Sequence, residues 1–127
     1  MSGELKDVLV VDDSASILQA VKLGMEQIGG IPTRTCSSGS EALGEIGSSP
    51  PQLILLDSVM PEMDGAAVLE RLRDDPKTAA LPVVFLTGEH SAADLEKYSS
   101  LGYTGLIEKP FDPMTLAERV KGIWNSL

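Results

Sequence analysis

The sequence predicts an α/β protein with a parallel sheet that is covered by helices on both faces. Short apolar runs alternate with longer amphipathic segments along the whole 127-residue chain. Continuously apolar runs are typical of strands buried on both faces, and the segments between them are long enough to form crossover helices. A chain of this length suits one domain, and no repeat or long linker divides it, so we expect residues 1–127 to form a single domain.

Five apolar runs supply the expected strands. They are VLVV at 8–11, IPTRTC at 31–36, LILL at 53–56, VVFL at 83–86 and GLI at 105–107. The second run contains Pro32 and the last contains Gly105, and these residues suit the edge of a sheet better than its centre. We therefore expect the second and fifth strands to lie at the edges.

The segments between the runs begin with residues that can cap helices. The expected starts are Ser14 or Asp13, Ser38 or Ser40, Gly65, Ser91 and Asp112. In the first helix, apolar residues recur at helical spacing until the glycine pair at 29–30, namely Ile17, Val21, Met25 and Ile28. The last helix is expected to place Leu116, Val120, Ile123 and Leu127 on one face.

Composition and charge exclude several classes of function. The chain is 43% hydrophobic and 23% charged, as expected of a globular protein, and its net charge of −9 disfavours nucleic acids and anionic membranes. Its single cysteine, Cys36, excludes an internal disulfide and a cysteine-based metal cluster. There is no cleavable signal pattern and no apolar stretch long enough to span a bilayer. We expect a cytoplasmic protein that binds neither nucleic acid nor membrane.

Polar side chains follow four of the expected strands. Asp12 and Asp13 follow the first, Asp57 the third, Thr87 the fourth and Lys109 the fifth. Each alone has an ordinary interpretation as a helix cap, a turn residue or a surface lysine. In an open parallel sheet, however, ligands bind beyond the carboxyl ends of the strands, where these residues would meet. Their convergence indicates a single site.

The residue types at this edge favour phosphoryl chemistry. Three carboxylates repel one another and favour a hard cation, for which Mg²⁺ is the best fit and Mn²⁺ a substitute. Thr87 and Lys109 are suited to hold an anion. Asp57, at a strand tip, is placed to act as a nucleophile toward phosphorus and form an aspartyl-phosphate.

Four motifs resemble the receiver domain of two-component response regulators. They are VVDDS at 10–14, LLDSVMPEMDG at 55–65, FLTG at 85–88 and EKPF at 108–111. Their order and spacing are similar to those of the family across nearly the whole chain, and the second motif is the most specific. The resemblance implies a flavodoxin-like, doubly wound sheet of five strands in the order 2-1-3-4-5 with five helices.

The resemblance also implies roles for individual residues. Asp57 would be the phosphoacceptor and would share a Mg²⁺ ion with Asp12 and Asp13, one of which would bind it through water, and with the backbone carbonyl of Val59. The implied phosphate-binding and switch residues are Thr87, Lys109 and Pro110, the last joined to the lysine by a cis peptide bond.

One position departs from the family pattern. Receiver domains usually carry tyrosine or phenylalanine three residues before the lysine, whereas this chain has Leu106, and its nearest aromatic residue is Tyr103, in the loop before the fifth strand. We expect the switch at Leu106 to be weaker or differently transmitted. Val59 and Glu89 occupy positions at which the family varies the lifetime of the phosphoryl group, although ordinary solvent exposure is an equal alternative.

The implied function is a signalling relay rather than an enzyme. A histidine kinase or histidine phosphotransfer protein would phosphorylate Asp57, and the chain would assist its own phosphorylation and dephosphorylation. Partners would bind the face formed by helix 4, strand 5 and helix 5, and a homodimer through that face stays an alternative. Trp124 and Leu127 would serve packing or a partner contact, and His90 is interpreted as a loop residue.

Two other classes of function fit the sequence less well than the relay. A phosphatase or phosphotransferase of the haloacid dehalogenase type also forms an aspartyl-phosphate. Such enzymes place the nucleophile after the first strand in a D-x-D pattern, whereas that position reads DDS here and the chain has no room for a cap domain. An interaction domain that works without phosphorylation is disfavoured by the intact acidic residues and Lys109.

Overall fold

The structure, a computed structural model, describes residues 3–88 and 92–127. Its strands are β1 (Val8–Val11), β2 (Thr33–Cys36), β3 (Leu53–Asp57), β4 (Val83–Thr87) and β5 (Gly105–Glu108). Its helices are α1 (Ala15–Lys22), the π-helix η1 (Leu23–Ile28), α2 (Gly39–Ser48), α3 (Gly65–Asp74), α4 (Ala92–Ser100) and α5 (Pro113–Asn125). The expected alternation of strands and helices is confirmed.

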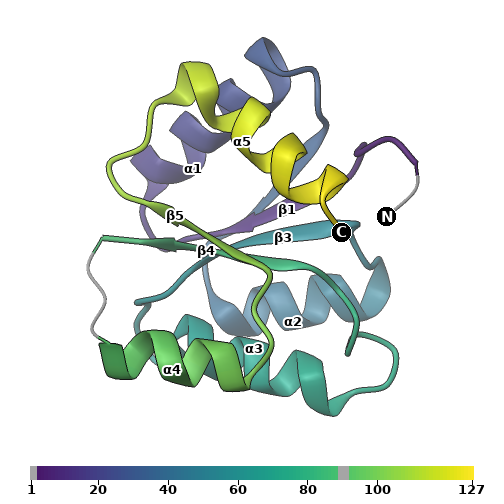
Figure 1. Cartoon of the computed structure of the whole chain (residues 1–127), viewed down its shortest axis with the longest axis vertical. Helices are drawn as coiled ribbons and strands as arrows, with labels where there is room; N and C mark the ends of the chain where they lie inside the picture. Colours follow the sequence, from purple (N-terminus) through teal and green to yellow (C-terminus); the bar gives the residue numbers. More distant parts are fainter. Residues whose placement is uncertain (1–2, 89–91) are drawn as a thin grey trace.

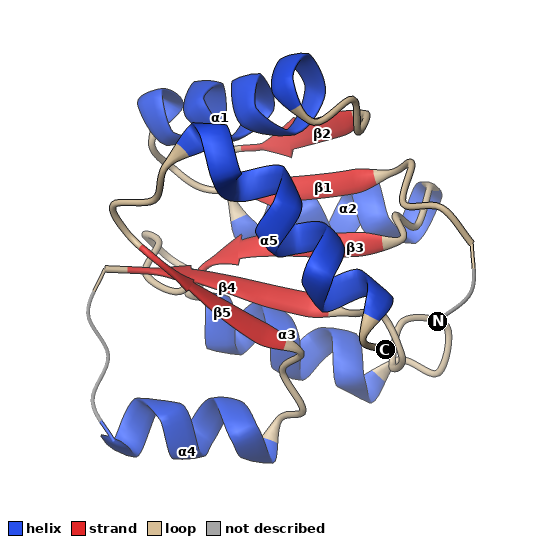
Figure 2. Cartoon of the chain, turned by 45° about the horizontal axis from the view of Figure 1, so that its top comes forward, coloured by secondary structure: helices blue, strands red, loops and turns tan. Residues whose placement is uncertain are grey.

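The strands form one parallel sheet in the order β2-β1-β3-β4-β5. The predicted order and the edge positions of β2 and β5 are therefore confirmed. Figure 1 shows α1 and α5 on one face of this sheet and α2, α3 and α4 on the other. In Figure 2 the same layers are seen from a second direction, with α5 crossing in front of the strands.

Alternation along each strand divides the apolar side chains between two cores. Successive residues of a strand point to opposite faces, so each short run contributes to both layers. The core beneath α1 and α5 contains Val8, Val10, Leu53, Leu55, Val84, Leu86 and Ile107 from the strands. The core beneath α2, α3 and α4 contains Leu9, Val11, Ile54, Leu56, Val83 and Phe85. This two-sided burial explains why the strands are continuously apolar.

Capping side chains fix where most helices begin. The side-chain oxygens of Ser14, Ser38, Asp64 and Asp112 accept hydrogen bonds from backbone N–H groups in the first turns of α1, α2, α3 and α5. Ser14 and Ser38 are thus the caps among the expected alternatives, and Pro113 lies in the first turn of α5 as predicted. The predicted start at Ser91 lies outside the described residues.

The first helix differs from its expected continuous α-helical course. After Lys22 the chain winds as a π-helix, and the Gly29 N–H donates to the Gly24 carbonyl five residues earlier at 3.0 Å. The wider turn rotates the following side chains, so that Met25 is buried but Ile28 is 41% exposed. The prediction that Ile28 lies on the same apolar face as Ile17, Val21 and Met25 was therefore wrong.

Two further boundaries differ from the sequence expectation. Strand β2 begins at Thr33 rather than residue 31, because Pro32 has no N–H to donate to a ladder. Helix α5 ends at Asn125, so Leu127 lies beyond it and is 43% exposed instead of sharing the buried face.

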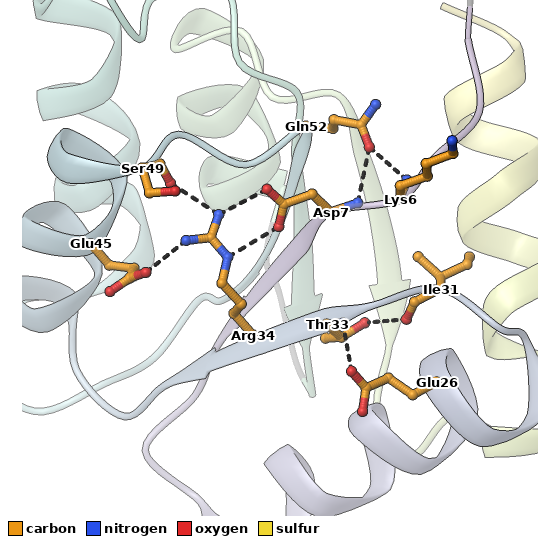
Figure 3. A network of polar contacts seen from close by, with 9 residues as sticks. All are labelled: Lys6, Asp7, Glu26, Ile31, Thr33, Arg34, Glu45, Ser49 and Gln52. Atoms are coloured by element: carbon orange, nitrogen blue, oxygen red, sulfur yellow. Dashed lines mark hydrogen bonds and ion pairs between the residues drawn. The ribbon is translucent and has the colours of Figure 1, made fainter.

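A polar network fastens the edge strand β2 (Figure 3). The Arg34 guanidinium donates from Nε and Nη2 to the two carboxylate oxygens of Asp7, at 3.0 and 3.1 Å. It also donates to Glu45 at 2.6 Å and to the Ser49 carbonyl at 2.9 Å. The paired, fork-shaped contact with Asp7 is the geometry in which partly exposed ion pairs contribute most. Arg34 thereby joins β2 to the start of β1 and to α2.

Substitution of Gly65 tests the tight junction between β3 and α3. A Cβ atom at Gly65 would lie 2.5 Å from the Asp57 carbonyl oxygen and 2.9 Å from the Phe85 ring, whereas one at Gly44 in α2 would meet nothing within 4 Å. We expect Gly65→Ala to lower the free energy of unfolding by about 1–3 kcal/mol. Gly44→Ala should raise it by about 0.5–1 kcal/mol through helix propensity. Urea titration of both variants measures this, and equal effects would contradict the described packing.

Candidate functional site

Three carboxylates meet at the carboxyl end of the sheet. Asp12 directly follows β1 and Asp57 ends the adjacent strand β3, with which β1 is paired in parallel register. Oxygen atoms of Asp12, Asp13 and Asp57 lie within 4.8 Å of one another. Asp12 is fully buried and Asp57 is 4% exposed, whereas Asp13 faces solvent. The expected convergence of these three side chains is what the fold produces.

Lys109 lies between the two buried carboxylates. Its Nζ donates to Asp12 Oδ2 at 2.9 Å and to Asp57 Oδ1 at 3.2 Å. The pairing of β4 with β5 delivers it there, because the Lys109 backbone N–H donates to the Thr87 carbonyl just past β5. Burial alone would lower the pKa of Lys109, but the hydrogen bonds and charges of Asp12 and Asp57 outweigh it, and the pKa lies above its usual value.

The pKa of Asp57 is raised to about 6. Burial is the largest cause, and the charge of Asp12 acts in the same direction. The Val59 N–H, which donates to Asp57 Oδ1 at 3.2 Å, and the Lys109 ammonium both favour the carboxylate and limit the rise. Asp57 is therefore mainly ionised at neutral pH, and its negative charge is only partly compensated by its neighbours.

One backbone donor and one side-chain donor hold the carboxylate of Asp12. The Ser14 N–H donates to Asp12 Oδ1 at 2.9 Å, so both Asp12 oxygens have a partner, one from Ser14 and one from Lys109. The same serine caps α1 through its hydroxyl. Ser14 therefore has two local roles, because its N–H holds the Asp12 carboxylate and its hydroxyl caps α1, and this accounts for the serine in VVDDS.

The remaining predicted residues take up varied positions. Thr87 is fully buried at the end of β4, and the Lys109–Pro110 peptide bond is cis. The Val59 side chain, two residues after Asp57, is 74% exposed. Leu106 is partly buried on β5. Glu89 and His90 lie outside the described residues.

Trp124 belongs to the packing of the molecule rather than to this site. Its side chain is 4% exposed, and its Nε1 donates to the Gly3 carbonyl at 3.0 Å. It is part of the core beneath α1 and α5. Of the two interpretations, packing therefore accounts for Trp124 without a partner.

Sequence reasoning missed two residues near Asp57. Ser58, next to Asp57, is 5% exposed and its N–H donates to the Leu86 carbonyl at 3.1 Å. Tyr98 on α4 is 6% exposed and interacts with the Ser58 side chain. Ser58 could have been found from the motif LLDS, in which it directly follows Asp57. A single tyrosine in the amphipathic segment 92–100 gave no comparable indication of where its hydroxyl would point.

The donor set determines what this pocket can hold. All three acidic side chains offer oxygen, and Asp13 is open to solvent, which fits a hard divalent cation that keeps several waters. The neighbouring ammonium of Lys109 fits an anion such as a phosphoryl group. The fold and site together define a doubly wound α/β protein with an acidic cluster at the carboxyl edge of its sheet.

The chain belongs to the response regulator receiver domain family, whose family model matches residues 8–121. It is 31% identical to the response regulator Rre1 of Synechocystis over 91% of this chain and 50% of that protein. It is 35% identical to the alkaline phosphatase synthesis transcriptional regulatory protein PhoP of Bacillus subtilis, over 93% of this chain and 48% of PhoP. The chain thus spans about half the length of these curated relatives.

A solved structure agrees with the observed fold. The chemotaxis protein CheY4 of Vibrio cholerae superposes with a TM-score of 0.87 at 31% identity, covering 94% of this chain and 99% of that one. Residues 3–88 and 92–127 contain no helix with the length and apolar character needed to cross a bilayer. The receiver-domain resemblance of the sequence is confirmed.

Replacement of Asp57 by asparagine tests the electrostatics of the pocket. Because the pKa of Asp57 is about 6 in the folded protein against 3.8 ordinarily, its ionisation costs stability progressively as the pH rises from about 4 to about 6. We expect Asp57→Asn to raise the free energy of unfolding at pH 7.5, without divalent cations, by on the order of 1–3 kcal/mol. The gain should vanish near pH 4.

Urea titrations at the two pH values, in the presence of a chelator, give this difference. Glu118→Gln, at an exposed carboxylate of α5, is the matched control and should change stability little at either pH. A destabilised Asp57→Asn protein, or a gain independent of pH, would contradict the described charge balance.

Proposed function

We propose that this chain is the phosphoacceptor unit of a two-component relay and that Asp57 receives the phosphoryl group. The observation that carries the proposal is the placement of the Lys109 ammonium between Asp12 and Asp57, at 2.9 and 3.2 Å. A buried carboxylate faced by a fixed cation is suited to charge-neutralised attack on phosphorus. The response regulator relatives support a histidine kinase, or a histidine phosphotransfer protein, as donor.

Asp12, Asp13 and Asp57 would hold the metal ion, together with the backbone carbonyl of Val59. Mg²⁺ suits this all-oxygen set, with Mn²⁺ as a substitute, and it would supply neutralisation of negative charge on the phosphoryl oxygens. The exposure of Asp13 and Val59 leaves room for water and phosphate at the same edge. The three clustered carboxylates support this assignment.

Transfer is a displacement at phosphorus. An Asp57 carboxylate oxygen forms the new bond to phosphorus as the bond between phosphorus and the donor's histidine nitrogen breaks, and that nitrogen keeps the electron pair. Lys109 pairs with the charge of the transferred group, and the Thr87 hydroxyl bonds one of its oxygens. Because Asp57 is mainly ionised at neutral pH, the attacking oxygen needs no separate base.

The phosphoryl group would leave by hydrolysis that the chain itself assists. The Val59 side chain, 74% exposed beside the acceptor, is apolar and cannot position an attacking water by hydrogen bonding. We therefore assign Val59 a role in lengthening the lifetime of the aspartyl-phosphate, with Glu89 as the second position that tunes it. The phosphorylated state would then last for a limited time and act as a signal, and the chain would not turn over a substrate repeatedly.

The phosphorylation signal would leave through α4, β5 and α5. Helix α4 and strand β5 both adjoin β4, whose end carries Thr87, and Lys109 follows β5 directly. A change at the pocket therefore has short structural connections to this face, which would bind a partner or a second copy of the chain. The acidic net charge of −9 disfavours direct binding of nucleic acid by residues 1–127 themselves.

Acetyl phosphate provides a direct test of the acceptor. Incubation with acetyl phosphate and Mg²⁺ should add one phosphoryl group, measured by intact-protein mass spectrometry. The adduct should be absent from Asp57→Ala and should fall sharply when a chelator replaces Mg²⁺, because the clustered carboxylates then repel the incoming anion.

Glu118→Gln serves again as the control and should be phosphorylated like the unmodified chain. An adduct that persists in Asp57→Ala would refute the assignment of the acceptor. Fast multiple turnover of small phosphate esters would instead indicate a phosphatase.

A further inference from the structure

Three aromatic rings connect α4 to the sheet beside the acceptor. The Phe85 ring on β4 is stacked on Tyr98 of α4, with ring centroids 4.3 Å apart and planes at 27°. Tyr103, from the loop before β5, lies 6.1 Å from each of the other two. Such distances are in the range in which aromatic pairs attract one another beyond simple burial. These three residues are called the aromatic cluster below.

The aromatic cluster is continuous with the acceptor segment. The Tyr98 side chain interacts with the hydroxyl-bearing side chain of Ser58, the residue after Asp57. The Phe85 ring and the Asp57 carbonyl both lie against Gly65, at 2.9 and 2.5 Å from the place where a Cβ would stand. Interiors packed this tightly transmit small displacements. A shift of the Asp57–Ser58 backbone therefore acts on Tyr98 through both a polar and an apolar contact.

Tyr98 is also the principal attachment of α4. Among the helix side chains at 93–100, Tyr98 is the one that is buried, at 6% exposure, and Leu95 is partly buried. The C-terminal end is held separately, where Arg73 of α3 donates to the Leu101 and Gly102 carbonyls at 3.2 and 2.9 Å. Among residues 93–100, Tyr98 is therefore the main contact of α4 with the sheet, while Arg73 holds the chain just after the helix, so any change at Tyr98 alters that contact.

The position on β5 that faces this cluster offers no polar group. Leu106 is the Cα partner of Phe85 in the β4–β5 pairing, and paired residues of adjacent strands point to the same face. That face is the one covered by α4. Leucine can pack there but cannot interact with the Ser58 hydroxyl, whereas Tyr98 does so from the helix.

The charge on Asp57 reaches Tyr98 electrostatically as well. The pKa of Tyr98 lies above its usual value, mainly because burial disfavours the phenolate, and the charges of Asp94, Asp64 and Asp57 add to the rise. The Ser58 side chain acts in the opposite direction. A phosphoryl group would increase the negative charge at Asp57 and add acceptor oxygens beside Ser58. The balance of interactions around the Tyr98 hydroxyl would then change.

We propose that Tyr98 is the positioning residue that couples the phosphorylation state of Asp57 to α4, through its contacts with Ser58 and Phe85. The inference rests on the proposed function and assigns the coupling to a residue on α4 instead of one on β5. Tyr98 takes no part in phosphoryl transfer itself. Its effect is on where α4 lies once the acceptor changes.

Amide NMR spectroscopy with beryllofluoride as the phosphoryl mimic tests this coupling. We expect beryllofluoride and Mg²⁺ to shift the amide resonances of residues 93–100 in the unmodified chain. Tyr98→Phe, which keeps the ring and removes the hydroxyl, should lose most of that shift. Ser58→Ala, which removes the hydroxyl that Tyr98 contacts, should lose it as well. Tyr103→Phe, the matched loss of a hydroxyl within the aromatic cluster, should keep it.

Phosphorylation by acetyl phosphate, measured by intact mass in the same four proteins, separates the inference from the proposed function. We expect all four to accept one phosphoryl group. If Tyr98→Phe and Ser58→Ala are phosphorylated and their α4 resonances shift as in the unmodified chain, the coupling role of Tyr98 is wrong and the acceptor assignment stands. If the unmodified chain forms no adduct, the proposed function and this inference both fail.

Discussion

The contact of one ammonium with two buried carboxylates is the interaction on which the rest of the site depends. Lys109 lies 97 residues from Asp12 and 52 from Asp57 along the chain, yet its Nζ bonds both. Two carboxylates this deep in the protein would repel each other strongly if no cation lay between them. The parallel sheet is the scaffold that makes the arrangement possible, because β1, β3 and β5 all end at the same edge.

Lys109 compensates only part of the negative charge of the carboxylate cluster, and the remainder bears on what the site can bind. The pKa of Asp57 stays raised, to about 6, because burial and the Asp12 charge together exceed the effects of Lys109 and the Val59 N–H. The uncompensated negative charge of this carboxylate cluster would favour a divalent cation, and the buried Asp57 carboxylate would gain from a new partner. The same electrostatics therefore favour both metal binding and transfer of a phosphoryl group, in the manner proposed.

The sequence predicted most of the fold and the polar residues of the site for identifiable reasons. Continuous runs such as VLVV and LILL are buried on both sides, and Asp12, Asp57, Thr87 and Lys109 follow strands whose ends a parallel sheet must bring together. The strand order was predicted from the family resemblance, because apolar runs alone do not indicate which strands pair with one another. The fold and the meeting of Asp12, Asp57 and Lys109 are confirmed because they depend on spacing within the chain, while the roles of the site residues stay predictions.

Features set by contacts between distant segments could not be predicted. The π-helical turn that exposes Ile28 occurs where Gly24 packs against the Pro113 backbone of α5. No local sequence pattern predicts this contact. The role of Tyr98 depends on its lying opposite Ser58 and Phe85, which only the docking of α4 determines. Leu106 departs from the family pattern, but the sequence gives no sign that Tyr98, 8 residues earlier, stacks on Phe85.

The most direct test of the central claim is to locate the phosphoryl group chemically. An aspartyl-phosphate is an acyl phosphate, and borohydride reduction converts that aspartate alone to homoserine, which peptide mass spectrometry can assign to a position. After treatment with acetyl phosphate and Mg²⁺, we expect homoserine at position 57 and unmodified aspartate at positions 12 and 13. Homoserine at position 12 or 13 but not 57, or at none of the three in protein that carries the phosphoryl mass, would contradict it.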